Sequence, residues 1–146
     1  MRSLAHHRHW IAVVALVAAV GTSACVEAPS DERVIDGPAT VEEIGADETR
    51  IILTEQAAER LAIETAPVER AGGQAVVPSG ALMLDPAGVY WVYTNSSPLV
   101  FVPQQVTLDR EDHNGLAYLV EGPPVGTDVV TLGAAELYGI EHGIGH

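Results

Sequence analysis

The sequence predicts a mainly β domain, a small antiparallel barrel or sandwich with one short helix, behind an N-terminal signal segment and a disordered linker. Two observations indicate this fold. Short runs of β-branched and aromatic residues alternate with turn signals about every eight to twelve residues, which is typical of small barrels and sandwiches. The length of 146 residues and the 47% hydrophobic content suit one domain with a buried core.

Residues 1–24 have the pattern of a bacterial signal peptide. Arg2 and Arg8 give a positive start, and residues 10–20 form an uncharged run. At 1.5 Å per residue this run is too short for a helix to cross a bilayer of about 30 Å. We therefore expect export and removal of this segment.

Small residues precede Cys25, the only cysteine of the chain. The run Gly21 to Cys25 resembles a bacterial lipobox, in which the signal peptide is cut before the cysteine and the thiol is lipidated. Ser23 and Ala24 fit this pattern, whereas Thr22 stands where an apolar residue such as Leu is usual. We expect Cys25 to anchor the protein by lipid at the extracytoplasmic face of the cell membrane. The alternative is ordinary secretion with a free thiol, which is a liability in an oxidising compartment.

Residues 25–49 are strongly acidic and are expected to form a flexible linker. They include eight acidic residues against one basic residue, Arg33, and prolines interrupt any apolar period. The whole chain has a formal charge of −13, which argues against nucleic acid as a partner. An anionic bilayer surface repels such a chain, so the lipid would have to hold it there.

From residue 50 onward, the pattern predicts a compact domain that extends to residue 146. A short strand over 50–53 leads to Thr54, which is suited to cap a helix over residues 55–61. Extended chain over 63–68 follows. The later part predicts further strands, which bring the total to seven or eight: 75–77, 81–84, 89–94, 99–102, 106–108, 116–120 and 129–132.

Turn residues separate these strands. Residues 85–88 (Asp-Pro-Ala-Gly) match a type I turn, and residues 112–115 end in Asn-Gly, a strong hairpin signal. The tail from residue 133 has room for one helical turn over 134–138.

Several segments in a consistent order carry a family resemblance. The run from Thr54 to Val68 has a helix, then Leu-Ala-Ile, then a strand, with Ala62 where the family has glycine. It resembles the opening of the membrane-proximal domain of periplasmic adaptor subunits, the membrane fusion proteins of efflux pumps. Other segments are similar to that domain's return strands and closing strand: 77–82, 85–93, 102–108 and 122–134. The resemblance covers residues 50–141.

The chain departs from this family in one large respect. In adaptors a barrel, a lipoyl-like domain and a helical hairpin separate the two ends of the membrane-proximal domain, whereas here Val68 and Val76 are 76 − 68 = 8 residues apart. No heptad repeat is present for such a hairpin. The resemblance implies a solitary domain that serves as an adaptor-like accessory of an integral membrane transporter. The alternative is a free-standing surface lipoprotein that binds a ligand or a metal ion through the same fold.

The residues suggest neither an enzyme nor a cofactor. Ser79 lacks the Gly-x-Ser-x-Gly context of a hydrolase nucleophile and is interpreted as a turn residue. His142 and His146 have the spacing of two metal ligands on one helical face, but Gly143 and Gly145 disfavour a helix there. The two histidines are weak metal candidates only.

An aromatic group is the candidate docking site. Tyr90, Trp91, Tyr93 and Phe101 lie on two predicted neighbouring strands. Strand alternation places Tyr90 and Trp91 on opposite faces. One face is expected to pack in the core, and the other is the candidate surface for a partner. Packing of both faces is the ordinary structural alternative.

Overall fold

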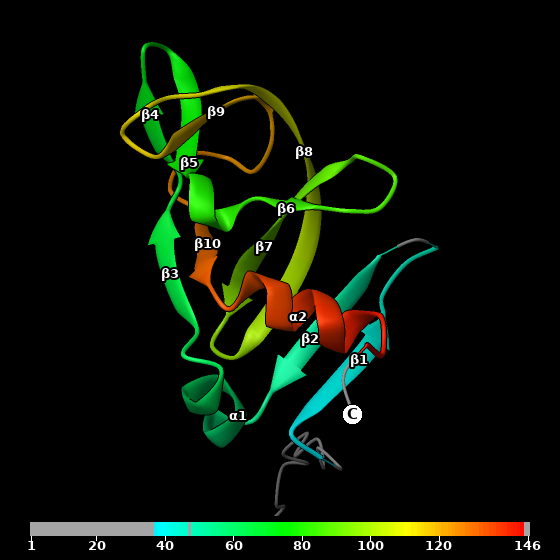
Figure 1. Ribbon diagram of the computed structural model, residues 1–146. Helices are drawn as coiled ribbons and strands as arrows, with labels where there is room; N and C mark the ends of the chain where they lie inside the picture. The colour runs from blue at the N-terminus through cyan, green and yellow to red at the C-terminus, as the bar shows by residue number, and fades with distance from the viewer. Residues whose placement is uncertain (1–36, 47, 145–146) are drawn as a thin grey trace, which may run out of the picture. The chain divides into compact units, whose positions relative to one another are not determined.

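The computed structural model describes residues 37–46 and 48–144, which form a mainly β domain, as the sequence predicts (Figure 1). The signal segment, Cys25 and residues 26–36 of the expected linker lie outside the described residues.

The described residues contain ten strands rather than the expected seven or eight, together with two α-helices. The strands are β1 (Ala39–Glu43), β2 (Thr49–Leu53), β3 (Glu64–Pro67), β4 (Glu69–Ala71), β5 (Gln74–Pro78), β6 (Met83–Leu84), β7 (Tyr90–Ser97), β8 (Val100–Glu111), β9 (Leu116–Glu121) and β10 (Asp128–Leu132). The helices are α1 (Glu55–Arg60) and α2 (Ala134–Glu141), and a short 3₁₀ turn, η1, spans Ser79–Ala81.

The long strand β8 organises the antiparallel sheet, whose order is β3-β10-β7-β8-β9-β5-β4. Residues 100–106 of β8 pair with β7, and residues 107–111 pair with β9. The register shifts on both sides of Leu108, where β8 passes from one partner to the other. The sheet therefore curls into a half-barrel, and β8 can be followed along its curve in Figure 1.

The ordered domain begins before residue 50, which corrects the predicted linker boundary. Strand β1 pairs with β2 from Ala39 opposite Leu53 to Glu43 opposite Thr49. The Arg50 guanidinium lies 2.6 Å from the Glu42 carboxylate. Acidic residues in this stretch are thus part of a hairpin, and the pairing with Arg50 offsets some of the charge that made the stretch resemble a linker.

The local capping and turn signals are confirmed. The Thr54 hydroxyl accepts a hydrogen bond from the Ala57 amide at 3.2 Å, which caps α1. The 112–115 turn joins β8 to β9, and its Gly115 adopts a φ of 78°. The C-terminal helix is longer than predicted, because α2 runs over eight residues to Glu141.

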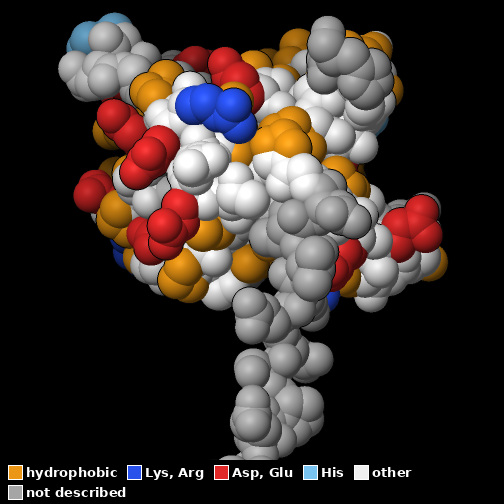
Figure 2. Space-filling view, turned by 90° about the horizontal axis from the view of Figure 1, so that it is seen from below, with side chains coloured by type: hydrophobic (Ala, Val, Ile, Leu, Met, Phe, Trp, Pro, Cys, Tyr) orange, Lys and Arg blue, Asp and Glu red, His pale blue; other side chains and the backbone are white. Residues whose placement is uncertain are grey.

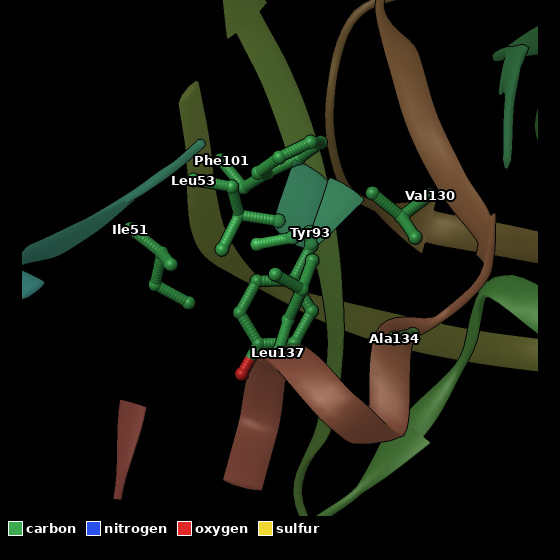
Figure 3. Close-up of a cluster of buried hydrophobic side chains, with 8 residues drawn as sticks. Ile51, Leu53, Tyr93, Phe101, Val130, Ala134 and Leu137 are labelled. Atoms are coloured by element: carbon green, nitrogen blue, oxygen red, sulfur yellow. The ribbon is translucent and has the colours of Figure 1, made fainter. Parts of the chain in front are cut away.

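Two hydrophobic clusters lie on opposite faces of β7. Val92 belongs to one cluster, with Val68, Val77 and Val129, and its side chain has no exposed surface. Tyr93, the next residue, belongs to the other cluster (Figure 3). That second cluster brings together β2, β7, β8, β10 and both helices: Ile51, Leu53, Ala57, Tyr93, Phe101, Val130, Ala134 and Leu137. Both faces of the aromatic strand are therefore covered at its centre.

Candidate functional site

The structure divides the predicted aromatic docking site. Tyr93 and Phe101 are only 1% and 3% exposed and pack in the core shown in Figure 3. Tyr90 is half-buried against the cluster that contains Val92. Trp91 is also half-buried, on the opposite face, as alternation predicts. The docking prediction is wrong for Tyr93 and Phe101, because residues of α2 and β2 pack over them.

Trp91 is held in place by the turn that precedes β7. One oxygen of the Asp85 carboxylate accepts a hydrogen bond from the Val89 amide at 2.8 Å, and the other accepts the Trp91 indole N–H at 3.1 Å. These hydrogen bonds lower the pKa of Asp85 below its ordinary value, and the bond from the Val89 amide has the largest effect. Asp85 therefore stays ionised at neutral pH and orients the indole ring.

A second carboxylate, at the end of α2, joins three elements. The Tyr93 hydroxyl donates to Glu141 Oε2 at 2.6 Å, and the Thr49 hydroxyl donates to Glu141 Oε1 at 2.6 Å. Burial, reinforced by the hydrogen bond to Glu141, raises the pKa of Tyr93. The phenol thus remains a neutral donor to the carboxylate.

A pocket of about 310 Å³ lies between these two carboxylates, and we call it the turn–helix pocket. Its aromatic walls are Trp91, Tyr93 and Tyr138. The remaining lining residues are Asp85, Pro86, Ala87, Pro103, Glu141 and His142. It thus combines apolar and aromatic walls with two acidic groups, an arrangement typical of sites for small molecules.

His142 lies at the rim of this pocket and is exposed. Its ring stacks on Tyr138 with centroids 4.1 Å apart, and Nδ1 lies 3.0 Å from the Tyr138 carbonyl oxygen. His146 lies outside the described residues. Within residues 37–46 and 48–144, no group of three or more metal-ligating side chains is arranged to hold a metal ion.

Sequence reasoning did not identify Asp85, Tyr138 or Glu141 as site residues. The sequence predicts only a turn at Asp85. Tyr138, Glu141 and His142 share one face of a helix at spacings of three and four, and this signal was present in the sequence. The helical turn that the sequence predicts ends at residue 138, so this prediction does not place Glu141 and His142 on the helix.

No model of a known protein family, no curated protein and no solved structure with which the chain was compared matches it. Among the described residues, no helix has the length and apolar character needed to cross a membrane.

Proposed function

We propose that this protein is a lipid-anchored, extracytoplasmic accessory of a membrane efflux or export transporter, adaptor-like and without enzymatic activity. One observation carries the proposal. Strand β3, from the segment that resembles the opening of the adaptor membrane-proximal domain, pairs with β10, from the segment that resembles its closing strand. Ala66 lies opposite Val129, and Thr65 lies opposite Val130. A solitary membrane-proximal domain requires this meeting of its two ends.

The short connection between the same two ends supports a domain that works without the distal parts of an adaptor. Strands β4 and β5 form a hairpin closed by Gly72 and Gly73, which have φ values of 58° and 87°. This hairpin occupies the chain position where adaptors insert the barrel, lipoyl-like and helical parts. The chain is therefore suited to contact a transporter at the membrane and lacks the parts that reach further.

The proposed anchor keeps the domain near its partner. From Cys25 to Ala39 there are 39 − 25 = 14 residue steps, which at ~3.5 Å each span at most about 50 Å. Confinement to this distance raises the effective concentration at a membrane partner, so weak contacts suffice for association. Acidic side chains are distributed over the face of the domain seen in Figure 2, which disfavours direct adsorption to anionic lipid.

Metabolic labelling with a palmitate analogue tests the anchor. We expect the wild type to be labelled and to fractionate with membranes, and Cys25→Ala to do neither. Equal labelling of the two proteins contradicts lipidation at Cys25.

Photo-crosslinking in intact cells tests the partner. All seven basic residues are arginines, so lysine-reactive reagents find no lysine side chain on this protein. A photoreactive amino acid at Val120, which is 62% exposed, avoids this difficulty. We expect crosslinks to an integral membrane transporter, and their loss in a Cys25→Ala background. Capture of no integral membrane protein, in cells where a known adaptor–transporter pair is captured, contradicts the proposal.

A second candidate function is a free-standing lipoprotein that binds a ligand. The turn–helix pocket is the observation that favours it.

A further inference from the structure

The turn–helix pocket contains two carboxylates that pair with no lysine or arginine of the described residues. Asp85 accepts hydrogen bonds from the Val89 amide and the Trp91 indole, and Glu141 accepts them from two hydroxyls. All four donors are neutral. No lysine or arginine lines the pocket or pairs with either acid among the described residues. Since a carboxylate has about four acceptor positions and Glu141 has two donors, Glu141 retains the capacity to accept further bonds.

The walls between these carboxylates are aromatic and apolar. Trp91 and Tyr138 contribute ring surface, and Pro86, Ala87 and Pro103 contribute aliphatic surface. The face of an aromatic ring carries negative electrostatic potential, so it attracts a positively charged group placed over it, with Trp the strongest of the three ring types.

The site is preorganised. Asp85 fixes the Trp91 ring through the 3.1 Å indole hydrogen bond, and Glu141 is fixed by two hydrogen bonds of 2.6 Å. A ligand that enters finds these groups already oriented and does not have to order them, which lowers the entropic cost of binding. The volume of about 310 Å³ lies at the lower end of the range of ~300–1,000 Å³ for small-molecule sites.

We propose that the turn–helix pocket binds a small organic cation, a primary or quaternary ammonium with an apolar body. The two carboxylates face the charge, and Trp91, Tyr138 and the prolines contact the apolar part. Both carboxylates repel an anion. A neutral apolar ligand would displace water from the carboxylates without replacing the hydrogen bonds that the water makes. A metal ion lacks a suitable group of three ligands in the described part of the chain. The inference does not depend on whether the protein associates with a transporter.

Tryptophan fluorescence of the full-length chain in detergent tests this site. The chain has two tryptophans, Trp10 and Trp91, so Trp10→Phe leaves the pocket residue as the only fluorophore of this type. The probes are choline, benzylammonium and tetraethylammonium. We expect at least one to cause a saturable change in Trp91 emission. The compound 3,3-dimethylbutan-1-ol is the neutral isostere of choline, with carbon in place of the quaternary nitrogen. If choline binds, this isostere should bind at least about tenfold more weakly.

Paired variants separate binding from folding. Glu141→Gln removes one pocket charge and should weaken cation binding about tenfold. Glu136→Gln removes an exposed charge from the same helix outside the pocket and should leave binding unchanged. Ala87→Phe fills the pocket from an exposed turn position and should abolish the saturable change while circular dichroism stays that of the wild type.

Four results would overturn the proposal. They are the absence of saturation with all three cations, equal affinity for choline and its neutral isostere, undiminished affinity in folded Ala87→Phe, and saturation by Zn²⁺ or Ca²⁺ alone in place of the organic cations.

Discussion

The Tyr93 hydroxyl donates a hydrogen bond of 2.6 Å to the Glu141 carboxylate, although the two residues lie 48 positions apart. Tyr93 is in the middle of β7, and Glu141 is the last residue of α2. The Thr49 hydroxyl, at the start of β2, donates to the other oxygen of the same carboxylate. One side chain thus fastens the C-terminal helix to two strands and at the same time forms one wall of the turn–helix pocket.

Tyr93→Phe should destabilise the domain by about 1.5–3 kcal/mol, the net value of a hydrogen bond to a charged group. The ring stays in the core, and only the hydroxyl is lost. Chemical denaturation measures the change in the free energy of unfolding. Tyr90→Phe is the matched control, because the Tyr90 hydroxyl makes no hydrogen bond with a described residue, and it should change stability by less than about 0.5 kcal/mol. Equal losses in the two variants would show that the Glu141 contact does not stabilise the fold.

The same contact gives an expected response to alkaline pH. The folded state raises the pKa of Tyr93 above its ordinary value of 10.0. Above about pH 10 the unfolded chain releases this proton and the folded chain retains it, so the free energy of unfolding falls by at most ~1.4 kcal/mol per pH unit from this group. Stability measured from pH 8 to pH 11 should therefore decline more steeply in the wild type than in Tyr93→Phe. Parallel curves would contradict the assignment.

Gly133→Ala should destabilise the domain through backbone strain and through a steric clash. A second glycine, Gly126, separates the two effects. Gly133 has a φ of 90°, and a Cβ there would lie 2.3 Å from Ile63 Cδ1 and 3.3 Å from the Leu61 carbonyl oxygen. Gly126 has a nearly equal φ of 92° with open space around it. We expect a loss of about 1 kcal/mol for Gly126→Ala from backbone strain, and about 2–4 kcal/mol for Gly133→Ala from strain and overpacking together. Thermal denaturation of both variants measures the difference, and equal losses would exclude the clash with Ile63.

Asp112 should make the 112–115 hairpin sensitive to acid. Its Oδ1 accepts hydrogen bonds from the Leu116 and Asn114 amides at 3.1 and 2.9 Å. These hydrogen bonds lower the pKa of Asp112 below 3.8, and the bond from Leu116 has the largest effect. The resulting stabilisation is present above the unfolded-state pKa and is lost as the pH falls through the folded-state pKa. The stability advantage of the wild type over Asp112→Asn should therefore shrink as the pH is lowered from 6 to 2. Asp128→Asn, at an exposed carboxylate with no hydrogen-bond partner among the described residues, serves as the comparison.

The sequence pattern within one strand predicts only part of the candidate site. Alternation along the aromatic strand correctly separates Trp91 from Tyr90, because a β-strand turns successive side chains to opposite faces. It does not reveal that Tyr93 is covered, since the cover comes from β2 and from α2, about 40 residues away on either side. The pocket forms only where those elements meet, so its two carboxylates have no joint signature in the sequence.

The sequence by itself determined the local features of this protein. The Thr54 cap, the 85–88 and 112–115 turns and the mainly β character follow from backbone preferences and hydrogen bonds that span a few residues. Only the tertiary structure decided that residues 39–43 of the acidic stretch form a strand, since β1 requires β2 as its partner and Glu42 requires Arg50. The tertiary structure also decided that β3 pairs with β10, and that the Tyr93 hydroxyl donates a hydrogen bond to Glu141. Such pairings depend on packing between distant segments, whose free energy is shared across the whole core.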